Sequence, residues 1–556
     1  MKGRDREFRL TKVSYVDFKH IEIERTLLNL FPRLKFDGYP GRVRLAGQAL
    51  TVEKFADEFT DEKNKHNFRG FADHKEIVYK WLETDLLDLV NRGRPTQAVV
   101  SPRPLHGNTY KFRNTRHARD YGTSEQVYWM LYHARNGLGQ AARDTLKEFI
   151  FTGLDLLTDK IQASAKIDIE TQAILHFESA VEVKRDTPDT TKDPERYPPL
   201  CIAHADLLAD DVLRLMAYQD YMPRSVLVDY LKTLLSFHLA LYHLRLLKLL
   251  PELVRRKRGD PPCALSTCPI ASNPIFPYVD CPYQLRLVVD MGDTSNVHMA
   301  ELARRSADTY YRRIPGYIQA QFIIKKLDEM AEYLHKANKL QRPTTGYFAV
   351  GDLLRLLEPA FASEREAYFK ARLAGFLEEA DNGEEHALDP EVRRVTEMGL
   401  GDFETYIEIL VALRGSFHRR YLVDCLDSLL LKNTESGLLR QSRTKGSPRR
   451  FALGSRLLEV LLQIAVLMPQ GSSFVTREIR IDELLLFLRE RYGLYIDCLP
   501  LNEGFGKPSI TDLQALRKNR ESFKMRLREI GFFQDLSDAY VTQTATPRYT
   551  ITTHHH

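Results

Sequence analysis

Apolar residues recur at intervals of three and four positions along most of this chain, a spacing that places them on one face of a helix. The pattern predicts long helices in the body of the protein, at residues 123–184, 205–258, 298–339, 351–381 and 390–431. Before residue 122 the elements are shorter but still mostly helical, and residues 285–289 form a short β-prone stretch. The predicted fold class is therefore mainly α, with a multi-domain helical body.

The last hundred residues carry a different order of elements. An apolar helix at residues 451–468 is followed by a β-prone stub at 474–476 and by a second amphipathic helix at 481–491. A third helix begins at a Ser-Ile-Thr-Asp capping signal, spans residues 509–530 and ends before a glycine. Residues 532–551 alternate as two strands joined by a polar turn. Helix, strand, helix, helix and hairpin in this order predict a C-terminal winged helix-turn-helix domain.

Loops rich in proline, glycine and charged residues divide the chain into candidate domains. In chain order we expect a mixed, mostly helical region at 1–122, a helical domain at 123–258, a Cys- and Pro-rich irregular insert with a short strand at 259–297, a second helical domain at 298–431, a basic linker at 432–450 and the winged-helix domain at 451–553. The histidines at 554–556 look like the remnant of a purification tag and are left out of the interpretation.

The composition is that of an ordinary globular protein that is too long for one core: 556 residues, 43% hydrophobic and 28% charged. Six cysteines are too few for a disulfide framework, and no apolar signal segment follows the charged first residues. The most apolar helix, at residues 225–254, contains two histidines, an arginine and a lysine, so it is expected to be buried. These observations predict a cytoplasmic protein without a membrane partner.

The net charge of +5 does not by itself indicate a nucleic-acid partner, but the basic residues are unevenly distributed. In a helix-turn-helix domain the third helix enters the major groove, so its cations are the expected contacts with duplex DNA: Arg517, Lys518, Arg520, Lys524 and Arg528. Cations of the linker and the hairpin would add phosphate contacts: Arg443, Lys445, Arg449, Arg450 and Arg548. The alternative is a solvated helix face on a winged helix that binds protein.

A second group of cations alternates with aromatic residues at positions 92–119. Such interleaving suits a nucleic-acid backbone with stacked bases. A solvated loop whose aromatic residues dock on the core explains it as well, and this is the interpretation that we favour.

Three cysteines, Cys263, Cys268 and Cys281, lie within one irregular, proline-rich segment with the spacing C-x4-C-x12-C. A structural zinc ion needs four ligands in a tetrahedron, and these thiols with one histidine could supply them. The spacing lacks the tight cysteine pair of finger and ribbon sites. We therefore expect no cofactor and keep the zinc site as the alternative.

Candidate catalytic residues are few. Asp290 and Asp293 follow the β-prone stretch, where nucleases place metal ligands, but no partner motif is present and a capped turn explains them more simply. Arg414 and His418 share one helix, but their spacing does not fit the R-x(4–6)-H pattern of helical ribonucleases. Phosphate-binding and hydrolase signatures are also absent, so no catalytic residue is assigned.

A helical body of several hundred residues, no catalytic motif and a winged helix behind a basic linker together resemble the accessory proteins of bacterial multi-gene anti-phage defence systems, in particular the uncharacterised component of the methylation-associated type. The resemblance is carried by this architecture and by the general character of residues 310–339 and 451–551. It implies protein partners, since such components work beside a methyltransferase, an ATPase or a nuclease. It transfers no functional residue.

The function expected from the sequence is that of a non-enzymatic DNA-binding or scaffold subunit of such a complex. It would contact duplex DNA through the winged helix and bind other protein subunits through the helical body. Two alternatives remain open. One is a pure protein-protein interaction subunit, and the other is a divergent metal-dependent nuclease centred on Asp290 and Asp293.

Overall fold

The computed structural model describes residues 8–45, 50–64, 68–91, 98–156, 158, 160–162, 167–181, 183–255, 281, 283–381, 390–444, 446–471, 473–533 and 543–552. Helices dominate this part of the chain, and each of its sheets has two strands. The predicted mainly α fold class is thereby confirmed. None of the helices in these ranges has both the length and the apolarity needed to cross a membrane.

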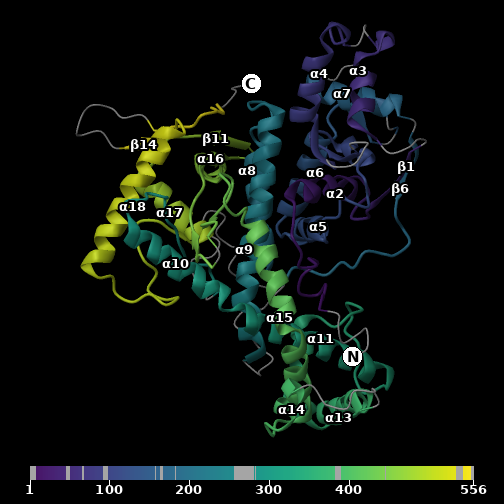
Figure 1. Ribbon diagram of the computed structural model, residues 1–556, viewed down its shortest axis with the longest axis vertical. Coiled ribbons are helices and arrows are strands. Elements are labelled where there is room, and N and C mark those ends of the chain that lie inside the picture. The colour runs from purple at the N-terminus through teal and green to yellow at the C-terminus, as the bar shows by residue number, and fades with distance from the viewer. Residues whose placement is uncertain are drawn as a thin grey trace.

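Two helices, α8 (Ile202–Met216) and α9 (Arg224–Arg255), contact each other at the centre of the molecule (Figure 1). α9 buries side chains on all of its sides, as expected for a helix whose apolar residues do not form a single stripe. The expectation of a buried helix at residues 225–254 is therefore confirmed. One of its histidines, His243, is fully bonded inside the core, through Nε2 to the Ser14 hydroxyl at 3.0 Å and through Nδ1 to the Leu239 carbonyl at 2.7 Å.

Burial lowers the pKa of His243 to about 4, because the charged imidazole would lose its hydration inside the core. A histidine of the unfolded chain titrates near pH ~6.5. The contribution of His243 to stability is therefore complete above pH ~6.5 and is lost as pH falls, by at most about 1.4 kcal/mol per pH unit. We expect the thermal midpoint to fall over this range, and to fall less steeply in His243→Gln. Equal slopes in the two proteins would contradict the assignment.

The N-terminal third of the chain packs against one side of the central helices (Figure 1). Its helices are α2 (Ile23–Lys35), α3 (Val52–Thr60), α4 (Lys75–Trp81), α5 (Thr123–His133), α6 (Leu138–Ile150) and α7 (Ile169–Ala180). Its described strands pair in antiparallel fashion: β1 (Gly41–Leu45) with β6 (Val183–Pro188), β2 (Leu87–Asn91) with β3 (Ala98–Pro102), and β4 (Leu154–Asp155) with β5 (Lys160–Ile161). Of these helices, α5 and α6 make the contacts with α8.

A second group of helices contacts α9 from another side and extends to the lower end of Figure 1. α11 (Ile314–Lys336) and α15 (Asp402–Leu429) pack on α9 and on each other. Three further helices pack on this pair: α12 (Val350–Arg355), α13 (Ala362–Asp381) and α14 (Pro390–Thr396). Residues 8–21, called here the N-terminal segment, have no regular secondary structure and connect both groups. Their backbone N–H groups reach Gln126 in α5 and Ser428 in α15.

The C-terminal region follows the predicted order of three helices, with more strands than expected. Its elements are α16 (Ser455–Ala465), β10 (Leu467–Gln470), β11 (Ser473–Thr476), β12 (Ile479–Arg480), α17 (Ile481–Tyr492), β13 (Leu494–Tyr495), α18 (Ile510–Glu529) and β14 (Thr544–Ala545). The first helix is shorter than predicted, because Phe451 belongs to a strand and Leu467 opens the β10–β11 hairpin. β14 pairs with β12, and the predicted polar turn at Ser537 and Asp538 lies outside the described residues.

Backbone hydrogen bonds join the C-terminal region to the helical body. β13 pairs in parallel with β7 (Leu287–Val288), the short strand expected near residues 285–289. Residues predicted as a linker form the hairpin of β8 (Leu439–Gln441) and β9 (Arg449–Phe451), and β9 contacts α10 (Val297–Tyr311). The C-terminal region therefore rests on the body through regular structure, and the domain boundary itself stays a prediction.

A buried cluster of charges makes a second connection between the two parts. Arg491 at the end of α17 is fully buried and pairs with Asp210 and Asp211 of α8. Asp211 also accepts hydrogen bonds from the Tyr492 hydroxyl at 2.8 Å and from His238 Nε2 at 2.9 Å. Burial opposes the ionisation of Asp211, but Arg491 and His238 outweigh it and hold the pKa of this carboxyl at about 2. The pair is therefore ionised at neutral pH.

Candidate nucleic-acid interface

α18 lies at the edge of the C-terminal region with one face toward the protein and the other toward solvent (Figure 1). The predicted capping signal is confirmed: Ser509 Oγ accepts from the Asp512 N–H, and the Asp512 carboxylate accepts from the Ser509 N–H. The glycine at the other end, Gly531, has a φ of +77° and ends the helix as expected. The buried residues recur at helical spacing: Ala515, Leu516, Asn519, Phe523 and Leu527.

One polar residue on the buried face fixes the position of α18. Asn519 donates to the carbonyls of Val289 at 2.9 Å and Ile496 at 2.8 Å, and its own carbonyl accepts from the Met291 N–H at 2.9 Å. All of its amide groups are thereby satisfied inside the core. Sequence reasoning did not select Asn519, although a single asparagine among apolar residues at helical spacing was the available signal.

None of the cations selected on the third helix is buried: Arg517, Lys518 and Arg528 are exposed on the outward face of α18, and Arg520 and Lys524 at its border are partly covered. Arg520 pairs with Asp482 of α17, and Lys524 pairs with Glu521 at 2.9 Å. Both carboxylates are about 60% exposed, at 62% and 60%. Ion pairs of this kind contribute about 0–1 kcal/mol in water, so another anion can replace the carboxylate at little cost.

The cations selected in the β8–β9 hairpin have different surroundings. Arg443 is exposed, and Lys445 lies outside the described residues. Arg449 donates to both carboxylate oxygens of Asp427, at 2.7 and 2.8 Å, and the Asp427 side chain is only 5% exposed. Arg450 Nε lies 3.1 Å from Asp290, which is buried. Two of these cations are therefore held by buried carboxylates of the protein itself.

The hairpin cation Arg548 lies beside the end of α18. Its guanidinium donates to the Ile530 carbonyl at 3.0 Å and lies over the ring of Phe532 at 5.4 Å. It also pairs with Glu459 of α16 at 3.4 Å. Arg548 is exposed, so it extends the basic outward face of α18 past the end of the helix.

A cavity of about 490 Å³ lies between the β8–β9 hairpin, the loop after β7 and α18. Three arginines line it, Arg440, Arg450 and Arg526, together with Glu435. Arg526 comes from α18, where it is two helical turns after Lys518, and it donates to the Ser455 hydroxyl at 2.7 Å. Sequence reasoning did not select Arg440 or Arg526. The cavity therefore lies between the hairpin and the side of α18 that carries Arg526, and three cations line it.

The two aspartates of the nuclease alternative form turns. Asp290 Oδ1 accepts from the Gly292 N–H at 2.8 Å, and Asp293 Oδ1 accepts from the Ser295 N–H at 2.8 Å. The favoured interpretation of a capped turn is confirmed. Burial raises the pKa of Asp290, whereas the Gly292 N–H and Arg450 act in the opposite direction. Within the described ranges, no three His, Cys, Asp or Glu side chains gather as metal ligands would.

The predicted zinc ligands are only partly within the described residues. Cys281 is half-buried and has a free thiol, whereas Cys263 and Cys268 lie outside these residues. The zinc site therefore stays a prediction.

The basic and aromatic run at 92–119 packs on the body through residues 98–114, whereas Arg116 and Arg119 are exposed. Arg103 pairs with Asp229 of α9 at 2.8 Å. Lys111 is buried and pairs with Glu178 of α7. The expected docking of aromatic residues on the core is confirmed for Tyr110 and Phe112, which are buried, whereas the expectation of a solvated loop is wrong for Arg103 and Lys111. Residues 92–97 lie outside the described ranges.

Comparison with known proteins gives one result for the whole chain. The family model described as methylation-associated defense system protein MAD7 matches residues 3–549. No curated protein matches the chain. The match extends over the helical body and the C-terminal region alike, so it covers both parts described above. The chain therefore belongs to the family of the methylation-associated defense system protein MAD7.

Proposed function

We propose that this chain is a non-enzymatic subunit that contacts duplex DNA through the outward face of α18, within a methylation-associated defence system. Family membership supports a role in anti-phage defence, and a multi-gene system implies other protein partners. The proposed contact with DNA is supported by one observation. The outward face of α18 presents cations over three helical turns, while the opposite face is fixed to the body by Asn519.

We also propose that the C-terminal region is a winged helix-turn-helix. Its three helices and the β12–β14 pair support this assignment. In such domains the third helix enters the major groove, and this helix is α18. The carboxylate partners of Arg520 and Lys524 are exposed, so phosphate can replace them, although the Lys524 side chain is itself only 14% exposed. The pair of Arg449 with Asp427 is too deeply buried for exchange.

The surroundings of Asp290 support a non-enzymatic subunit over a nuclease. The carboxylate is buried, and its charged neighbour is Arg450 at 3.1 Å. An arginine at this distance occupies the place at which a catalytic carboxylate would hold a divalent cation.

The test is binding of the purified full chain to a labelled random DNA duplex across a salt series. About five phosphate contacts correspond to a slope of about −4 to −5 in log K against log [salt]. The double variant Lys518→Glu/Arg520→Glu should bind at least about tenfold more weakly and with a smaller slope. Arg42→Glu/Arg44→Glu on β1 is the matched control, because it changes the net charge equally at two exposed positions far from α18 (Figure 1).

Two results would overturn the proposal. Wild-type affinity in Lys518→Glu/Arg520→Glu would show that α18 is not the contact surface. No binding by the wild-type protein at low salt would favour the pure protein-interaction subunit, whose partner would then be sought by co-purification.

A further inference from the structure

A second candidate site lies on the other face of the body, between the N-terminal segment and α15. A cavity of about 310 Å³ is lined by Arg9 and Lys19 of the N-terminal segment and by Phe417, His418 and Tyr421 of α15. None of these residues belongs to α18 or to the β8–β9 hairpin. The cavity is at the small end of the range for organic ligands and large enough for one ring system.

One residue that lines the cavity has a polar atom without a partner. His418 is 8% exposed, and its Nε2 forms no hydrogen bond with the described residues. Phe8 stacks on the imidazole at 4.2 Å between ring centroids, so the ring is held in place. Burial, with Arg414 and Lys19 nearby, lowers the pKa of His418 to about 4. A neutral ring with one free nitrogen has capacity for one hydrogen bond to a ligand.

Aromatic and cationic groups alternate at the mouth of the cavity. Phe417 is 45% exposed, and Lys19 Nζ lies 3.8 Å from the ring centroid of Tyr421. Arg420, which is outside the lining itself, lies over the same ring at 5.2 Å. With the carboxylates that the structure describes, neither Lys19 nor Arg420 forms an ion pair, in contrast to Arg520 and Lys524 on α18. The lining residues include two cations, Arg9 and Lys19, and one carboxylate, Asp17, and Arg9 is paired with Glu125 behind the cavity.

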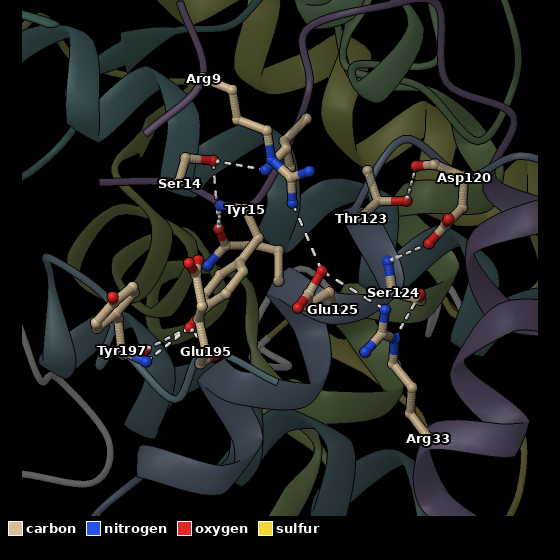
Figure 2. Close-up of polar contacts among 12 residues, drawn as sticks. Arg9, Ser14, Tyr15, Arg33, Asp120, Thr123, Ser124, Glu125, Glu195 and Tyr197 are labelled. Carbon is tan, nitrogen blue, oxygen red and sulfur yellow. Dashed lines mark hydrogen bonds and ion pairs between the residues drawn. The ribbon is translucent and has the colours of Figure 1, made fainter. Parts of the chain in front are cut away.

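The wall opposite α15 is fixed by contacts further inside the protein. Figure 2 shows Arg9 and Arg33 converging on Glu125 of α5, each at 3.5 Å. In the same view the Tyr15 hydroxyl donates to the Glu195 carbonyl at 2.6 Å. The N-terminal segment is therefore anchored on α5 beside the cavity, although it has no regular secondary structure.

We propose that this cavity binds one nucleotide, with the base stacked on Phe417 and bonded to His418 Nε2, and with its phosphate on Lys19 and Arg420. Exposed aromatic rings interleaved with unpaired cations are the combination that holds unpaired bases and their phosphates. The nucleotide is either free or one unit of a single strand, and both carry the same base and phosphate. The site is independent of the duplex contact proposed for α18.

The test uses the full chain with two probes, adenosine monophosphate and a fluorescein-labelled ten-nucleotide single strand. Calorimetry measures binding of the first and fluorescence anisotropy binding of the second. Phe417→Ala should weaken binding of the recognised probe by roughly tenfold, because one stacked base is lost. Tyr333→Ala removes an aromatic ring of comparable exposure, 54% against 45% for Phe417, from α11 and should bind as the wild type does.

The outcomes are distinguishable from those of the duplex experiment. Lys518→Glu/Arg520→Glu should leave binding of both probes unchanged, and Lys19→Met should weaken it. Binding of both probes assigns the site to free nucleotides, and binding of the strand alone assigns it to single-stranded nucleic acid. The proposal is overturned if neither probe binds the wild-type protein, or if Phe417→Ala and Tyr333→Ala bind equally well while both fold normally.

Discussion

The Arg491→Met variant is expected to lose about 3–5 kcal/mol of stability, the largest effect of any single substitution considered for this chain. Arg491 and Asp211 are both fully buried, and their charges compensate each other between α17 and α8. Methionine fills most of the same volume but leaves the carboxylate of Asp211 without its main partner. That carboxyl then either stays charged in the core or takes up a proton, and both states cost free energy.

The matched control for Arg491→Met is Arg520→Met, which removes the same kind of side chain from an exposed Arg–Asp pair. It should change stability by less than about 1 kcal/mol. Denaturant titration at neutral pH, followed by circular dichroism, measures both variants against the wild type. Equal denaturation midpoints for the two variants would show that burial does not determine how much the Arg491 pair contributes to stability.

The Gly493→Ala variant is expected to lose about 3 kcal/mol. Gly493 ends α17 at a φ of +75°, and a Cβ at this position would lie 2.0 Å from the Leu285 carbonyl oxygen. The glycine also accepts the Leu287 N–H at 2.7 Å, which aligns β13 with β7. The added carbon must therefore push apart the strands that join the C-terminal region to the body.

The loss in Gly493→Ala has two contributions, the positive φ and the close approach to Leu285, and Gly346→Ala separates them. Gly346 has a φ of +80°, and a Cβ there would meet no atom within 4 Å. Gly346→Ala should lower the free energy of unfolding by about 1 kcal/mol, the cost of placing a Cβ on a residue with positive φ. Hydrogen exchange at residues 285–290 should rise in Gly493→Ala and stay unchanged in Gly346→Ala. Similar stability in both variants would show that the close approach to Leu285 is not limiting.

Helices were predictable from the sequence because their apolar spacing is local. The buried central helix and the capping box of α18 follow from residues within a few positions of one another. Short strands were less predictable, since each consists of only two to six residues and some of them pair with a partner that is distant in the sequence. β13 and β7, for example, are about two hundred residues apart. β7 lies in the predicted β-prone stretch, but nothing in the sequence indicated that β13 would be its partner.

Cations on a helix face could be predicted, but their partners could not. Arg449 and Lys518 are equally basic in the sequence, yet one is held by the buried Asp427 and the other is exposed. The contacts of His418 could not be predicted either. In the sequence it stands out only through its spacing from Arg414, which does not fit the ribonuclease pattern. In the structure, Phe8 stacks on His418 and Lys19 lines the same cavity, and both lie about four hundred residues earlier in the chain.

The contacts between the C-terminal region and the body also constrain how this sequence can change during evolution. A segment cut near residue 451 and placed in another protein would carry Arg491 away from Asp210 and Asp211, and would leave β13 without β7. Neither half can change these positions alone without the cost of an unpaired charge or an unpaired strand. We therefore expect α8 and α17 to be inherited as one unit, with substitutions at Asp211 and Arg491 occurring together across relatives.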